Sequence, residues 1–331
     1  MLNIKASFLW TLVAVVALAC ATTAAYADEA TPPSVPPDPM EIAAPSLAGN
    51  YCCPRQDCLE DLTLWNFFSA GWDDAWAKRE RETGTPDFAL LRVQTNFMER
   101  EFRVNAFGEE NINSPKIKNL TDVDDLIAWS FNRRFMISVT DAYEWIDPRT
   151  GTREGGGLPG IAGRFQLVDT ESSSYSLNVK AQSANPEVGV TQTTLSYGIA
   201  GFEDLAYWFN LNRVGLYYSC LFDSYTGPAA AGTKTSDVQY DVTVAKTITA
   251  ADTPLFGALT MFAETFAQTD LDGSHDGRTI VSITPGVRFN LGQLECIKMG
   301  SGNWILLGVD LPVSDYHPWD EIYRLTYIKN F

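Results

Sequence analysis

The end of the chain alternates strictly between apolar and polar positions. Residues 278–291, 303–313 and 322–331 each place apolar side chains on one parity and polar or charged side chains on the other. This period of two predicts strands, because successive side chains of a strand point to opposite faces of its sheet. Ten further segments, from residue 88 onward, also read as strands. A soluble sandwich would alternate in the same way, so the pattern predicts an all-β protein without saying what its apolar face touches.

The first residues of the chain indicate export. Lys5 precedes an apolar run from Phe8 to Ala21, and Ala25-Tyr26-Ala27 is a small-x-small cleavage site. The run has about 14 residues, whereas a membrane-spanning helix needs roughly 20. We therefore expect a cleaved secretory signal over residues 1–27. The alternative, a lipoprotein acylated at Cys20, matches its motif less well.

An exported chain of alternating strands that ends on Phe resembles the outer-membrane β-barrels of Gram-negative bacteria. In these proteins the last strand carries apolar side chains at every second position, and Tyr323, Leu325, Tyr327 and Phe331 fit that pattern, whereas Lys329 departs from it. By this resemblance the four residues form the signal for the barrel assembly machinery. The resemblance implies an outer-membrane, transmembrane, antiparallel up-and-down β-barrel whose apolar face contacts the lipid bilayer.

The sequence allows two numbers of strands. Thirteen segments read as strands, but bacterial single-chain barrels have even numbers. Counting residues 62–72 as a strand gives fourteen, which we favour, and merging two weak early segments gives twelve. Short turns alternate along the chain with longer connections rich in Gly, Pro, Asp and Asn, which is typical of short periplasmic turns and long outer loops.

These observations predict three parts of the chain. The signal peptide occupies residues 1–27, and a Pro-rich periplasmic linker with a Cys cluster occupies residues 28–61. The barrel follows over residues 62–331, within which residues 62–87 would alternatively form a plug or an amphipathic segment. In the linker, we expect Cys58 to form a local disulfide with Cys52 or Cys53 rather than a metal site.

Charge and hydropathy narrow the choice of partners. The net charge of −17 argues against nucleic acid. The mean hydropathy of −0.10 is expected if lipid-facing and lumen-facing residues alternate and average out. No segment after the signal reaches 18 consecutive apolar residues, so no transmembrane helix is predicted.

If the apolar parity faces lipid, the other parity lines the lumen. Arginines and carboxylates occur there together, so they form either a selectivity lining or a polar network that holds a narrow barrel together. A barrel of 12 to 14 strands is intermediate between a filled one of about 8 and open porins of about 16 to 18, which leaves both readings open. The lumen-lining candidates are Arg92, Arg103, Arg213, Asp241, Glu264, Arg278, Arg288, Asp310 and Arg324.

Several motifs resemble a specific family. SITPGVRFNLG, NWILLGVDLPVSD and YRLTYIKNF are similar to the C-terminal part of the transporter-like barrel family named for the MetA pathway of phenol degradation. LIAWSFNRRFMISVTDAYEW resembles its recurring hairpin, and TMFAETFAQTD resembles its strand with a glutamate, here Glu264. The resemblance covers residues 88–331. It implies a channel that passes small organic solutes, apolar ones included, by diffusion without a cofactor.

The sequence allows two functions other than a channel. One is a closed structural barrel that acts through its outer loops. The other, less favoured because we expect no enzyme, is a membrane-embedded hydrolase that uses His275 or His317, the latter beside Ser314 and Asp315. A calcium loop is a weak further possibility, with Asp270, Asp272 and Asp276 as ligands, but a polar hairpin tip is the favoured interpretation.

Overall fold

The computed structural model describes most of the chain from Leu59 onward. The predicted signal peptide, Cys20 and the cluster of Cys52, Cys53 and Cys58 lie outside the described residues. The chain divides into two units at Glu60 and Asp61, and the description concerns the second unit. The described ranges are 59–79, 81–86, 88–94, 96–110, 112, 117–148, 153–157, 159–185, 190–228, 233–250, 253, 257–291 and 302–331.

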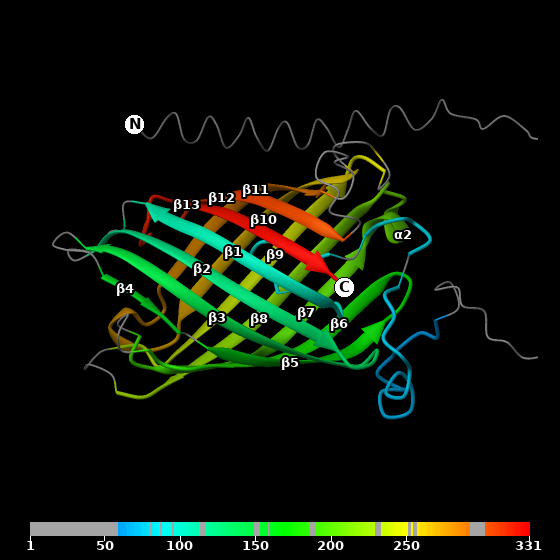
Figure 1. Cartoon of the computed structure of the whole chain (residues 1–331), viewed down its shortest axis with the longest axis horizontal. Coiled ribbons are helices and arrows are strands. Elements are labelled where there is room, and N and C mark those ends of the chain that lie inside the picture. The colour runs from blue at the N-terminus through cyan, green and yellow to red at the C-terminus, as the bar shows by residue number, and fades with distance from the viewer. Residues whose placement is uncertain are drawn as a thin grey trace, which may run out of the picture. The chain divides into compact units, whose positions relative to one another are not determined.

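Twelve antiparallel strands of the described residues close into a β-barrel (Figure 1). The barrel closes because β1 pairs with both β2 and β13, and β2 pairs with β3. The strands are β1 Arg100–Glu110, β2 Ile117–Ser130, β3 Phe135–Pro148, β5 Gly160–Asp169, β6 Ser173–Gln182, β7 Thr193–Asp204, β8 Val214–Thr226, β9 Ser236–Thr247, β10 Gly257–Asp270, β11 Thr279–Asn290, β12 Asn303–Pro312 and β13 Glu321–Asn330.

Three small elements accompany the barrel strands. The four-residue strand β4, Arg153–Gly156, pairs with the far end of β3, whereas β5 pairs with the near end of the same strand. The helix α2, Leu205–Phe209, joins β7 to β8 and is capped by Asp204, which accepts the backbone N–H groups of Ala206 and Tyr207. A 3-10 turn, Gly273–His275, lies between β10 and β11. No helix among the described residues is long and apolar enough to cross a membrane.

The count of fourteen strands that the sequence favoured is wrong. Neither residues 62–72 nor residues 88–97 form a strand of the barrel. The first segment is a series of turns, and the second places Phe88, Leu90 and Phe97 in a buried cluster, so its apolar residues serve packing inside the barrel. The wall therefore begins at Arg100 and has twelve strands.

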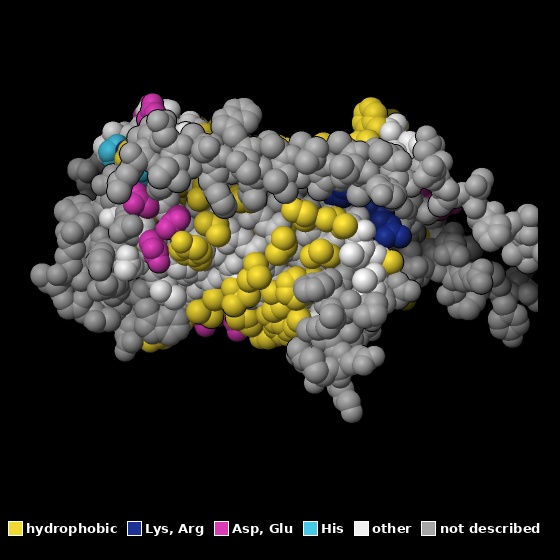
Figure 2. Space-filling model, turned by 90° about the horizontal axis from the view of Figure 1, so that it is seen from above, with side chains coloured by type: hydrophobic (Ala, Val, Ile, Leu, Met, Phe, Trp, Pro, Cys, Tyr) yellow, Lys and Arg dark blue, Asp and Glu magenta, His cyan; other side chains and the backbone are white. Residues whose placement is uncertain are grey.

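The apolar parity of the strands faces outward, as predicted. Val242 of β9 is 49% exposed, whereas its inward neighbours Asp241 and Thr243 are buried. A closed sheet has one inner and one outer face, so the period of two assigns every strand residue to one or the other. Figure 2 shows apolar side chains gathered on one flank of the barrel. Exposed apolar residues around the wall include Ile127, Val139, Ile161, Leu195, Ile199, Val244, Leu307 and Leu325.

The two ends of the barrel differ. At one end the strands are joined by tight connections such as residues 131–134 and 170–172, and Phe331 lies there, donating its backbone N–H to the carbonyl of Arg100. We call this the short-turn end. At the opposite, long-loop end lie the connections between β3 and β5 and between β12 and β13.

Candidate functional site, the barrel lumen

Residues 61–85, the rim segment, cover the short-turn end. Leu62 forms a β-bridge with Asp169 at the end of β5, and Ala75 forms one with Asn132 in the turn between β2 and β3. Arg134 is fully buried and donates to the backbone carbonyls of Ala70, Gln166 and Leu167 at 2.9 Å each. The rim segment is thereby fastened to the strand ends by backbone and side-chain hydrogen bonds.

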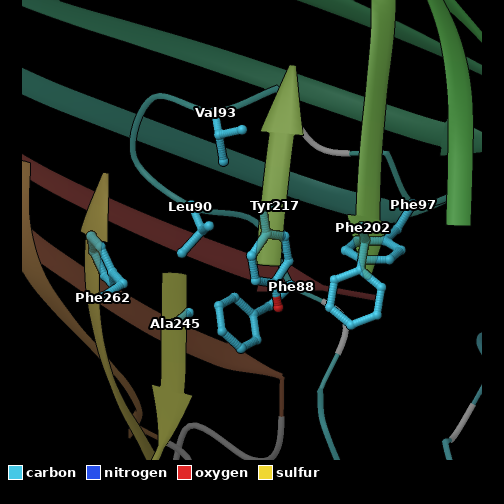
Figure 3. Packing of buried hydrophobic residues seen from close by; sticks show 8 residues of the cluster. All are labelled: Phe88, Leu90, Val93, Phe97, Phe202, Tyr217, Ala245 and Phe262. Atoms are coloured by element: carbon cyan, nitrogen blue, oxygen red, sulfur yellow. The ribbon is translucent and has the colours of Figure 1, made fainter. Parts of the chain in front are cut away.

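Residues 86–99, the lumen segment, then run inside the barrel. Their apolar side chains pack against an apolar patch on the inner wall formed by β7 to β10 (Figure 3). The ring centroids of Phe97 and Phe202 lie 5.4 Å apart, and those of Phe88 and Tyr217 lie 5.5 Å apart. The full cluster is Phe88, Leu90, Val93, Phe97, Phe202, Tyr217, Ala245 and Phe262. The side of the lumen next to the short-turn parts of β7 to β10 is therefore filled by the protein's own chain.

Glu264 of β10 holds the turn of the lumen segment. Its Oε1 accepts the backbone N–H of Leu91 at 2.8 Å, and its Oε2 accepts that of Arg92 at 2.7 Å. Glu264 is fully buried, and these two N–H groups have no helix or sheet partner, so carboxylate and backbone satisfy each other. Further along, the Nδ2 of Asn96 donates to the carbonyl of Ser174 at 3.0 Å.

Asp310 of β12 anchors the side chain of Arg92. Its Oδ2 accepts Nη1 of Arg92 at 2.6 Å and Nη2 of Arg324 at 2.7 Å, and its Oδ1 accepts the hydroxyl of Thr284 at 2.6 Å. The guanidinium of Arg92 also stacks on the ring of Phe266, 3.6 Å from the centroid. This buried carboxylate has donors on both oxygens, which is the condition for a buried charge to be tolerated.

A cavity of about 520 Å³ remains in the lumen and extends from Glu101 and Ala128 near the short-turn end to Tyr225 near the long-loop end. Arg92 and Gln94 of the lumen segment form its floor, and the strands from β1 to β9 supply its walls. Seven carboxylate residues and four basic residues line it, together with hydroxyl and amide side chains. We call this cavity the polar cup.

The structure brings four of the sequence-derived candidates into one contact network, which contains Arg92, Glu264, Asp310 and Arg324. Asp241 is buried nearby and accepts the hydroxyl of Ser219 at 2.9 Å.

The other candidates lie apart. Arg103 lines the polar cup, 2.6 Å from Glu101. Arg288 is buried and stacks on the ring of Trp304, 3.6 Å from its centroid, and on the lumen segment's Phe88. Two candidates lie at the ends of the barrel. Arg213 donates to the carbonyl of Thr249 at the short-turn end, and Arg278 lies 3.7 Å from Asp270 at the long-loop end.

The sequence reasoning missed the carboxylates of the polar cup. Asp122 and Asp124 of β2 and Glu144 of β3 line it, but the Gly, Pro, Asp and Asn content of residues 110–124 and 144–159 predicts loops there. The sequence did offer a signal for them. Asp122 and Asp124 continue the parity of Leu126 and Ala128, which point inward from the same strand.

Neither minor site gains support from the geometry. The ring Nδ1 of His317 contacts the backbone carbonyl of Ser314, while the Ser314 hydroxyl donates to the carbonyl of Tyr316, so the two side chains do not form a nucleophile–base pair. Asp270 accepts Lys234 at 2.9 Å, and Asp272 accepts Thr235 and Ser236. Within the described ranges, no group of three or more His, Cys, Asp or Glu residues is arranged to hold a metal ion.

No family model and no curated protein matches the chain. The resemblance to the MetA-pathway family therefore stays a prediction. Solved structures similar to the chain include the NanC porin, with 8% identity and a TM-score of 0.45 over 70% of this chain and 99% of that one. Another is the β domain of the Bordetella autotransporter BrkA, with 13% identity and a TM-score of 0.43 over 70% and 100% of the two chains. The outer membrane protein OprD from Pseudomonas aeruginosa has 10% identity and a TM-score of 0.32 over 70% and 65%.

At TM-scores below 0.5, these likenesses carry no argument about what the protein does. The fold rests on the strand pairing described above, and the function has to be argued from the lumen.

Proposed function

We propose that the protein is an outer-membrane channel whose lumen is closed by its own lumen segment. The observation that carries the proposal is the combination of an apolar outer face with a polar lumen occupied by residues 86–99. An apolar belt on a closed barrel leaves no unpaired strand edge and suits a lipid environment. A covalently attached segment inside the lumen is suited to block passage when docked and to permit it when displaced.

In this proposal the short turns face the periplasm and the long loops face outward. The signal peptide of residues 1–27 directs export, and the terminal strand, with Tyr323 and Phe331, is read by the assembly machinery. The solutes are small organic molecules, and the charged candidates of the lumen set their selectivity. Membership of the MetA-pathway family and passage of apolar solutes belong to the same proposal.

Single-channel recording in a planar bilayer tests the proposal. The full mature chain should conduct rarely, because the lumen segment fills the side of the lumen next to the short-turn parts of β7 to β10. Deletion of residues 28–97 should give steady conductance. Glu264→Ala removes both acceptors of the lumen segment's backbone, so we expect it to increase the fraction of time that the channel is open.

The matched control for Glu264→Ala is Thr265→Ala, the next residue of β10, which points outward and is paired with Val242. It should leave the conductance of the full chain unchanged. A deletion variant that folds as a barrel but never conducts would overturn the channel proposal.

A closed barrel that acts through its outer loops is the second candidate. The observation that favours it is that three different wall residues bind the lumen segment. Glu264 and Ser174 accept hydrogen bonds from it, and Asp310 forms an ion pair with it. In that case the lumen segment is a permanent part of the core, and neither Glu264→Ala nor the deletion would produce conductance.

A further inference from the structure

Two carboxylates of the polar cup face each other across neighbouring strands. Asp122 of β2 is the direct register partner of Glu144 of β3, and both residues line the cavity. Like charges directly opposite each other on antiparallel strands repel, because their Cβ atoms lie about 5 Å apart. Among the described residues, the structure gives neither side chain an ion pair. Four basic residues line other parts of the cup, but this pair of carboxylates has no ion-pair partner among the described residues.

One carboxylate oxygen of Asp122 is also buried without a partner. Asp122 is only 8% exposed, and its Oδ1 has no hydrogen-bond partner among the described residues. A buried polar atom without a partner costs free energy, and the cost is larger for a charged group. Asp310, a buried carboxylate in the same lumen, shows the usual solution, since its two oxygens accept from two arginines and a hydroxyl. The contrast indicates that the partner of Asp122 comes from outside the chain.

The rest of the cup suits an organic ligand. Its volume of about 520 Å³ falls within the range of small-molecule sites, roughly 300 to 1,000 Å³. Among the described residues of the cup, Glu101 leaves Oε2, Asp223 leaves Oδ1 and Arg103 leaves Nε without a hydrogen-bond partner. The cup therefore offers a ligand both acceptors and a donor, with acceptors in the majority. Asn105, Thr140 and Gln239 add neutral polar groups. A bare metal ion fits less well, because the described residues form no cluster of metal ligands.

We propose that the polar cup binds a small organic cation, with an ammonium group between Asp122 and Glu144 and a polar body against the hydroxyl and amide side chains. An ammonium supplies three donors and a positive charge. Its charge would offset the repulsion between the two carboxylates, and one of its donors would bind Oδ1 of Asp122. This inference rests on the proposed channel function and specifies its solutes as small organic cations. Binding itself does not require the lumen segment to move.

Isothermal titration calorimetry on the full mature chain, folded in detergent at low ionic strength, tests the proposal with spermidine as the probe. Spermidine should bind, and triethylene glycol, a neutral molecule of similar length, should not. The double variant Asp122→Asn, Glu144→Gln should weaken spermidine binding at least about tenfold, because it removes charge-assisted hydrogen bonds. The single variants provide the same comparison if the double variant fails to fold.

The matched control is Asp125→Asn. Asp125 lies on the same strand as Asp122 but is exposed on the outer face, so the variant changes the net charge equally without altering the cup. It should bind spermidine as the unchanged chain does. Equal affinity in the double variant, or equal loss in Asp125→Asn and Asp122→Asn, would overturn the proposed site, as would absence of binding at millimolar spermidine.

This experiment separates the two proposals. Binding without conductance in the deletion variant would leave a cation site on a closed barrel. Conductance without spermidine binding would leave a channel for a different solute.

Discussion

The two halves of the lumen belong to one barrel but solve the problem of an enclosed space differently. In the half next to the short-turn parts of β7 to β10, the inner wall is partly apolar and is covered by Phe88, Leu90, Val93 and Phe97 of the lumen segment. In the half next to β1 to β6, the inner wall is polar, rich in carboxylates and open enough to leave a cavity. One half is a packed protein core, and the other half leaves room for a ligand.

The buried carboxylates of the lumen also differ in their hydrogen bonding. Glu264 and Asp310 are fully buried and have partners on both carboxylate oxygens. Asp122 is nearly as buried and lacks a partner on Oδ1. Since the residue type and the inward direction are the same, the difference comes from what faces each group. The lumen segment donates to Glu264 and Asp310, and no donor reaches Oδ1 of Asp122 among the described residues.

The largest expected effect comes from removing the carboxylate that anchors the side chain of Arg92. Asp310→Asn leaves the buried guanidinium groups of Arg92 and Arg324 without their shared carboxylate, so we expect the free energy of unfolding to fall by about 3 to 5 kcal/mol. Equilibrium unfolding in urea, with the barrel in lipid or detergent, measures it. In the polar cup, Glu144→Gln relieves repulsion and should be neutral or stabilising by up to about 1 kcal/mol. Equal destabilisation by both variants would remove the distinction between the halves.

A slightly smaller effect is expected from truncating the aromatic contact of the lumen segment. Phe88→Ala deletes a ring that is 2% exposed, which should weaken docking of the segment by about 3 kcal/mol. Tryptic cleavage after Arg92 reports undocking, and its rate should rise about hundredfold if cleavage follows the undocked population. Phe68→Ala, at a ring that is 92% exposed, should leave the cleavage rate unchanged. An unchanged rate in Phe88→Ala would mean that the apolar cluster does not hold the segment.

The outer face of the barrel differs from the lumen because it is apolar along both halves. Val242→Arg puts a charge on the exposed side of β9 and should cost roughly 2 to 4 kcal/mol in a bilayer. Gln239→Arg, on the lumen side of the same strand, should be tolerated because Asp223 lies within hydrogen-bonding reach. Folding yield into vesicles measures both. Normal assembly of Val242→Arg would show that the apolar parity does not contact lipid.

The sequence predicted the wall well where strands face an apolar environment. Residues 278–290, 303–313 and 322–331 were predicted, and the strands are Thr279–Asn290, Asn303–Pro312 and Glu321–Asn330. The alternation is clear there because one face is uniformly apolar. That contrast is a local property and needs no knowledge of the partner strand.

The sequence could not predict which segments leave the wall or extend it. Residues 88–97 are apolar enough for a strand, and only contact with residues more than 100 positions away, such as Phe202 and Phe262, makes them a lumen segment. Asp122 and Glu144 fall in segments whose Gly, Pro, Asp and Asn content predicts loops. In a barrel with a wet lumen that rule fails, since the inner face of β2 and β3 continues past the apolar belt.

The smallest expected effect concerns the connection between β10 and β11 at the long-loop end. Asp272, outside the membrane-spanning strands, accepts the hydroxyl and backbone N–H of Thr235 and the backbone N–H of Ser236, and these hydrogen bonds lower its pKa below the usual 3.8. A lowered pKa means that the contact stabilises the loop fully above pH 3.8 and is lost as the pH falls through the lowered value. Amide hydrogen exchange of Thr235 and Ser236 should therefore lose protection, after correction for intrinsic rates, only below about pH 4. Asp272→Asn should reduce protection at neutral pH, because the charge that strengthens both contacts is gone. Asp276→Asn, in the same loop, should not. If protection at Thr235 were the same in all three proteins, the long-loop rim would be held by its strand ends alone, as the short-turn rim is held by Arg134.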